Sequence, residues 1–203
     1  GWPTNSTKYL RRAILASGEN GGLSADNVGD PQYYYTTFKF RMNANCQSGK
    51  IFRIYANDPQ KNIYLSTGGP DYFLRGFSER SDVAQSTEWG HGRQFQADVW
   101  HRVEIKMDQS PGVFTAAIDG EIVVDKPTWA TVGAIGGHTV DYPNMMDGAS
   151  RGYGTAGTYS YTDIFADYTQ ARVELGDAST WAAVVRREIQ IPLSWSNTSV
   201  NVA

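Results

Sequence analysis

Two segments with the composition of β-strands carry basic or tyrosine side chains two positions apart. The segment YYYTTFKFRM carries Lys39 and Arg41, and KIFRIYAN carries Arg53 and Tyr55. Successive side chains of a strand point to opposite faces, so residues two apart share a face. A guanidinium can bind a carboxylate or sulfate through two parallel hydrogen bonds. We therefore expect these four residues, with Arg102, to form one ligand-binding sheet face; the alternative is that each is a solvated outer position.

A second group of chemically capable residues lies in the short segment EWGHGR. Trp89, His91 and Arg93 bring an aromatic ring, a base and a cation close together in what reads as a loop. Loops held on a rigid scaffold often carry ligand groups. The alternative is an ordinary connection with Trp89 packed beneath it. His101 shares a strand face with Val103, and we expect it to be structural.

Tyrosines gather in the glycine-rich segment RGYGTAGTYSY, which includes Tyr153 and Tyr159. Tyrosine rings and hydroxyls suit stacking and hydrogen bonding to a polar ligand. The alternative, a tyrosine-rich loop packed on a sheet edge, is left open.

Composition favours one β-rich domain. The chain has 203 residues, 13% of them aromatic, and 21 glycines. This balance is typical of strands joined by many turns, and the length fits a single sandwich. The net charge of −3 gives no support to nucleic-acid binding, and no apolar run is long enough to span a membrane. The single cysteine excludes an intrachain disulfide, and the initial glycine leads us to expect a mature or trimmed chain.

Period-two alternation predicts an antiparallel sandwich and its core. Asp119-Gly120 between alternating apolar residues is a strong signal for a tight hairpin. The segment from Thr180 to Arg187 is equivocal between helix and strand. The residues expected between the sheets are Phe38, Phe40, Phe52, Ile54, Val103 and Ile105.

Four segments together resemble a known superfamily. They are WHRVEI from Trp100, the hairpin IDG that ends at Gly120, the segment Lys50–Arg53 and YTDI from Tyr161. The pattern resembles the concanavalin-A-like jelly rolls, and within them the polysaccharide-lyase-like and carbohydrate-binding β-sandwich domains. The resemblance implies an all-β antiparallel β-sandwich over residues 1–170 and a C-terminal β extension over 171–203. That extension stops early for its kind, so we expect the native chain to continue past Ala203.

The resemblance implies a secreted protein that recognises a polysaccharide, and an acidic one if the cations bind it. Two alternatives stay open: a polysaccharide lyase acting on uronate-containing glycans by β-elimination, and a structural or adhesion domain. The paired-carboxylate strand of the jelly-roll glucanases is missing, which argues against glycoside hydrolysis. The alginate-lyase strand motifs are missing too.

A lyase needs a group that neutralises the uronate carboxylate, a base and an acid. If the chain is a lyase, Arg53 with Tyr55 would neutralise and position the substrate, and His91 or Tyr159 would move the proton. The resemblance also implies a structural calcium ion remote from the cleft, held by Asp163 with Glu19 as a second ligand. Calcium requires several oxygen ligands.

The calcium expectation predicts a melting shift. A bound ion stabilises the folded state by roughly 2.7 kcal/mol when calcium is in 100-fold excess over its dissociation constant. We expect a higher melting temperature with calcium than with a chelator. An unchanged melting temperature would count against the site.

Overall fold

The computed structural model describes residues 13–16, 23–25, 33–42, 49–56, 62–68, 73–79, 86–108, 112–126, 138–142, 158–169, 172–184, 187–190 and 192–202. These ranges fold almost entirely as antiparallel β-strands, as the alternation predicts. Among them, no helix is long and apolar enough to cross a membrane.

One six-stranded sheet, here the β3 sheet, has the order β1-β12-β3-β8-β9-β10. Its strands are β1 (Ala13–Ala16), β3 (Tyr33–Met42), β8 (His101–Asp108), β9 (Val113–Ile118), β10 (Glu121–Lys126) and β12 (Thr158–Asp167). The Asp119-Gly120 turn joins β9 to β10 with φ angles of 51° and 87°. Positive φ at both central residues is the geometry that a tight two-residue hairpin requires, so this prediction is confirmed.

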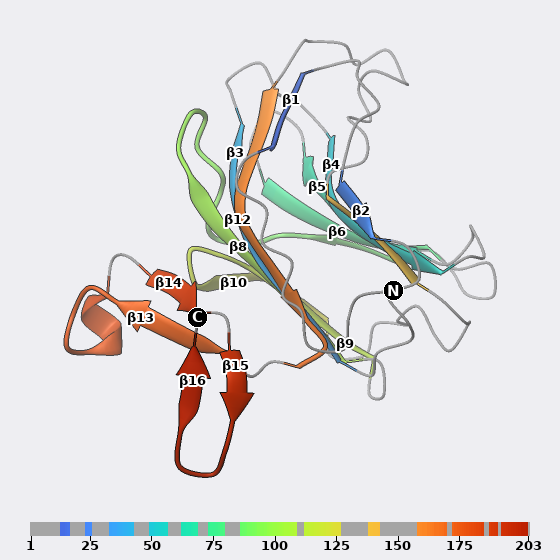
Figure 1. Cartoon of the computed structure of the whole chain (residues 1–203). Helices are drawn as coiled ribbons and strands as arrows, with labels where there is room; N and C mark the ends of the chain where they lie inside the picture. Colours follow the sequence, from blue (N-terminus) through green and yellow to red (C-terminus); the bar gives the residue numbers. More distant parts are fainter. Residues whose placement is uncertain are drawn as a thin grey trace.

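A second six-stranded sheet, here the β4 sheet, has the order β2-β11-β4-β5-β6-β7. Its strands are β2 (Leu23–Ala25), β4 (Gly49–Ala56), β5 (Asn62–Gly68), β6 (Phe73–Glu79), β7 (Ser86–Trp89) and β11 (His138–Tyr142). The two sheets face each other as the layers of a sandwich (Figure 1).

The core between the sheets contains every residue expected there: Phe38, Phe40, Phe52, Ile54, Val103 and Ile105. Phe40 lies at its centre, with ring centroids 5.1 Å from Phe95 and 5.2 Å from Tyr159. Alternation failed at one position. Strict alternation would put Ile51 on the face of Arg53, but Ile51 is fully buried because the pairing of β4 with β5 shifts register between Lys50 and Phe52.

The prediction that the cations share one sheet face is wrong. Lys39 lies on β3, directly opposite Arg102 on β8, whereas Arg53 lies on β4 in the other sheet. The chain passes from one sheet to the other between Met42 and Gly49. Because each sheet turns its apolar residues inward, the polar positions of β3 and β4 lie on opposite outer faces of the sandwich.

The C-terminal segment forms two hairpins outside the sandwich. Strands β13 (Val173–Gly176) and β14 (Arg187–Gln190) make one, and β15 (Pro192–Trp195) and β16 (Val200–Val202) make the other. Both lie on the side of the β3 sheet away from the β4 sheet (Figure 1). The segment that was equivocal between helix and strand contains one short 3₁₀ turn, Trp181–Ala183.

A buried ion network holds the first hairpin against the β3 sheet. The Arg102 guanidinium donates to both carboxylate oxygens of Glu174 on β13, at 3.1 and 3.2 Å. Arg172 also pairs with Glu174, and it donates to Glu104 at 3.1 Å. Tyr35 donates its hydroxyl to Glu104 at 3.0 Å and carries the Arg172 guanidinium 4.5 Å above its ring. Side chains of β3, β8 and the C-terminal segment are therefore connected by one network of ion pairs and hydrogen bonds.

The network sets the protonation of its members. Burial by itself raises the pKa of Glu174, but Arg102 and Arg172 outweigh it and hold that pKa below its usual range. Burial, with Glu104 beside it, raises the pKa of Tyr35. Burial lowers the pKa of Arg102, but Glu104 and Glu174 outweigh it and raise it overall. Glu174 is thus charged, and Tyr35 is a neutral donor, at neutral pH.

Replacing Glu174 by Gln tests this attachment. The Glu174 side chain is 4% exposed, and its replacement removes the carboxylate that Arg102 and Arg172 share. We expect the free energy of unfolding to fall by about 3 kcal/mol at neutral pH, the lower end for a broken buried pair. Because the Glu174 pKa is lowered by folding, its contribution is present above the ordinary glutamate pKa of about 4.3 and is lost as the pH falls below it. Denaturant unfolding of both proteins should therefore converge at acid pH.

Glu188→Gln on β14 is the matched control, since Glu188 is exposed. It should change stability by no more than about 0.5 kcal/mol. Equal effects of the two substitutions would contradict the network.

Candidate functional site

The outer face of the β4 sheet can be built from strand register. In antiparallel pairs, residues directly opposite each other lie on the same face. Arg53 on β4 is opposite Tyr64 on β5 and Asp141 on β11, and Tyr64 is in turn opposite Phe77 on β6. One row across the sheet thus places a cation position beside two aromatic positions.

Two further rows flank this one. On one side, Lys50 is opposite Ser66, Ser66 is opposite Arg75, and Arg75 is opposite Trp89 on β7. On the other side, Tyr55 is opposite Asn62 and Thr139.

Burial identifies the face on which these rows lie. Ile54, Leu65, Thr67 and Leu74, which alternate with the row positions, are fully buried. The row positions therefore belong to the outer face. We call them the β4 outer face: Lys50, Arg53, Tyr55, Tyr64, Arg75, Phe77 and Trp89. Lys50 and Arg53 are half-buried there.

Sequence reasoning found Arg53, Tyr55 and Trp89 but missed Tyr64, Arg75 and Phe77. The strands that carry these three, NIYLSTG and FLRGFSE, do alternate. That alternation would have marked them as outward positions. Alternation within a strand does not reveal which strands are neighbours in the sheet, so it could not show that these residues lie beside those of β4 and β7.

Arg93 and His91 lie in the segment that passes from an edge of the β4 sheet to the β3 sheet. The N–H of Gly90 donates to the Leu74 carbonyl on β6, and the N–H of His91 donates to the Val123 carbonyl on β10. A Cβ on Gly90 would lie 2.3 Å from the Leu74 oxygen, so this crossing requires glycine. His91 itself is exposed.

Asp119 holds the C-terminal end of that segment through hydrogen bonds from Arg93, His101 and Arg102. Its carboxylate accepts from Arg93 Nε and from the His101 ring, both at 2.8 Å, and from the N–H of Arg102 at 2.8 Å. Burial raises the pKa of Asp119, but the hydrogen bonds from His101 and Arg102 outweigh it, and the pKa lies below its usual range. His101 Nε2 accepts from the N–H of Gln96, so Nδ1 is the donor to Asp119. His101 is structural, as expected, and Arg93 supports the hairpin turn.

Tyr159 does not fit the acid or base role expected of it. Its side chain is 1% exposed and belongs to the core. Its hydroxyl shares a hydrogen bond of 3.0 Å with Thr67 on the facing sheet. A polysaccharide has no access to this position. Tyr153, the other tyrosine expected to bind ligand, lies outside the described residues.

Asp163, expected to bind calcium, sits in an irregularity of β12 with a φ of 54°. Its carboxylate is paired with the Lys39 ammonium at 2.9 Å. In the described ranges no three histidine, cysteine, aspartate or glutamate side chains gather as metal ligands. Glu19 lies outside those ranges. The described residues do not by themselves make a calcium site, and calcium binding stays a prediction.

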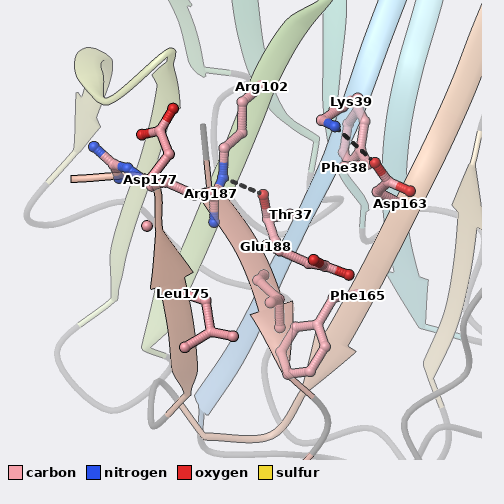
Figure 2. A pocket seen from close by; sticks show the side chains of 12 residues that line it. Thr37, Phe38, Lys39, Arg102, Asp163, Phe165, Leu175, Asp177, Arg187 and Glu188 are labelled. Atoms are coloured by element: carbon pink, nitrogen blue, oxygen red, sulfur yellow. Dashed lines mark hydrogen bonds and ion pairs between the residues drawn. The ribbon is translucent and has the colours of Figure 1, made fainter. Parts of the chain in front are cut away.

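A pocket of about 510 Å³ lies between the β3 sheet and the β13–β14 hairpin. Figure 2 shows Lys39 and Asp163 at one end of it and Arg187 with Asp177 at the other. Both signs of charge line it. Its floor includes Thr37 and Phe165, which are buried. The C-terminal hairpin thus covers much of the β3 sheet at this point.

Comparison with solved structures gives the fold. An endo-β-1,4-glucuronan lyase from the fungus Trichoderma reesei matches with a TM-score of 0.58 at 14% identity, over 83% of this chain and 89% of that one. The alginate lyase Aly36B matches with a TM-score of 0.59 at 11% identity, over 79% and 86%. A botulinum neurotoxin type C, whose cell entry depends on two ganglioside molecules, matches at 0.55 and 11% identity, over 83% of this chain and 42% of that one. No family model and no curated protein sequence matches. The chain has the concanavalin-A-like jelly-roll fold.

Replacing Tyr159 by Phe separates a structural role from a chemical one. Loss of its hydrogen bond to Thr67 should lower the free energy of unfolding by about 1 kcal/mol. Because the ring stays in the core, binding or turnover of any glycan should be unchanged. A large loss of glycan binding or turnover without a loss of stability would indicate that Tyr159 does take part in the functional site.

Proposed function

We propose that this chain binds a polysaccharide through the β4 outer face. The observation that carries the proposal is the strand register, which gathers Arg53, Lys50 and Arg75 with four aromatic positions on one outer surface. Aromatic rings supply flat apolar area with polar edges, and cations supply directed hydrogen bonds. Sugars offer both apolar ring faces and hydroxyl groups to such a surface.

The other outer face is less suited to a long polymer. The β13–β14 hairpin lies across the β3 sheet, and Arg102 there is bound to Glu174. A chain of sugars needs an uninterrupted surface. The likeness to the two lyases and the neurotoxin supports a glycan ligand without identifying it.

We propose further that the glycan is acidic. Lys50, Arg53 and Arg75 supply three positive charges, against two carboxylate positions in the same rows: Asp141, directly opposite Arg53, and Glu79, opposite Asn62. Such a surface favours uronate or sulfate groups over a neutral sugar. We propose a secreted location, since polymers of this kind lie outside cells.

A lyase is the second candidate function. Both lyase structures match over nearly their whole length. Arg53 can neutralise a uronate carboxylate, and Tyr55 and Tyr64 occupy neighbouring positions from which a phenol can act as acid or base. Incubation with glucuronan and alginate, followed by the ultraviolet absorbance of unsaturated products, separates the two functions. An increase in absorbance that the Tyr64→Phe substitution abolishes would establish that the protein is a lyase. No increase at high protein concentration would indicate that it binds the polysaccharide without cleaving it.

Replacing Arg53 by Lys tests the binding face. Lysine keeps the charge but loses the two-pronged hydrogen-bond geometry. We expect affinity for an acidic oligosaccharide to fall by about tenfold, the equivalent of one charge-assisted hydrogen bond. Calorimetric titration should also show weaker binding at higher salt, because exposed charges are screened.

Arg187→Lys is the matched control. Arg187 lies on β14, stacked 4.2 Å from the Trp181 ring, beyond the β3 sheet. Its substitution should leave affinity unchanged. Binding that ignores salt and both substitutions would contradict an acidic ligand on this face.

A further inference from the structure

One end of the β3 sheet carries a second exposed group of side chains. It begins at the end of the pocket that Lys39 and Asp163 line beside the β13–β14 hairpin, and it consists of Lys39, Arg41, Asp98, Trp100 and Asp163, here the Trp100 patch. All five are partly or well exposed, and Trp100 keeps 41% of its surface accessible.

Backbone pairing brings Trp100 next to Arg41. Phe40 opposite His101 is the last pair between β3 and β8, and Arg41 directly follows that pair on β3 while Trp100 directly precedes it on the other strand. The N–H of Asp98 donates to the Met42 carbonyl at 2.7 Å, which keeps this segment alongside the end of β3. His101 is buried in the core, and the preceding residue therefore lies on the outer side.

The charges of the Trp100 patch balance. Lys39 is paired with Asp163 at 2.9 Å and Arg41 with Asp98 at 3.2 Å. Two cations face two carboxylates, so the patch has no net charge. This distinguishes it from the β4 outer face, where cations outnumber carboxylates.

The ion pairs still have hydrogen-bonding capacity. A guanidinium has five N–H donors and a carboxylate accepts several hydrogen bonds. A single contact between Arg41 and Asp98 uses only part of either group. Donors and acceptors therefore flank an exposed indole, and among the described residues that indole has no aromatic or cation partner.

We propose that the Trp100 patch is a second glycan site, which takes an uncharged polysaccharide. The indole stacks on the apolar face of a sugar ring, and the Arg41–Asp98 pair donates to and accepts from neighbouring hydroxyls. An acidic polymer is disfavoured because its carboxylates would meet Asp98 and Asp163. Because the two sites lie on opposite faces of the sandwich, one molecule can bridge two polysaccharide chains of different charge.

Affinity electrophoresis in gels that contain xylan, mixed-linkage β-glucan or galactomannan tests the site. We expect at least one of these neutral polymers to retard the protein, with little dependence on salt. Trp100→Ala should weaken that retardation by about tenfold, and Trp100→Tyr should retain part of it, because the aromatic face is kept. Arg41→Ala tests the hydrogen-bonding pair if Trp100→Ala lowers stability.

Trp195→Ala is the matched control. Trp195 is 52% exposed and lies on β15, in a stretch without charged residues from Ile189 to Ala203. This variant should be retarded like the unchanged protein. Absence of retardation by all three polymers overturns the proposal, as does equal retardation of the Trp100→Ala, Arg41→Ala and unchanged proteins. Titration with an acidic oligosaccharide reports on the β4 outer face separately, so failure at one face is distinguished from failure at the other.

Discussion

The buried pairing of Arg102 with Glu174 holds the C-terminal hairpin over one outer face of this sandwich. Two guanidinium and two carboxylate groups are held there with limited water, and each is stable only while its partners are present. The pairing attaches the C-terminal hairpin to the β3 sheet. As a result the middle of that sheet is covered, and the proposed polysaccharide site lies on the opposite side of the sandwich, at the β4 outer face.

A sandwich with two apolar inner faces has two polar outer faces, and here they differ in charge. On the β4 outer face, three cation positions stand among aromatic positions across four strands. At the exposed end of the β3 sheet, each cation has its own carboxylate. The proposed preference of one surface for acidic sugars and of the other for neutral ones rests on this difference in composition.

Local pattern predicted the strands, the core and the hairpin turn, because these depend on alternation and on the chemistry of two residues. It could not predict that Lys39 and Arg53 lie on opposite faces, since the sheet that each strand joins is a long-range property. It placed Ile51 outside, because a register shift is invisible in the alternation. The role expected of Tyr159 was wrong for a related reason. A tyrosine can be buried in a core when its hydroxyl has a hydrogen-bond partner, and that partner, Thr67, lies on the facing sheet, which the local pattern does not show.

Residue-resolved NMR can show whether a glycan binds the β4 outer face. Amide chemical shifts would be followed while an acidic oligosaccharide is added to the isotope-labelled chain. We expect shift changes centred on β4, β5 and β6, with Arg53 and Tyr64 among the largest, and no change around Tyr35 and Glu174. Shift changes confined to the β3 sheet and its C-terminal hairpins would contradict binding at the β4 outer face.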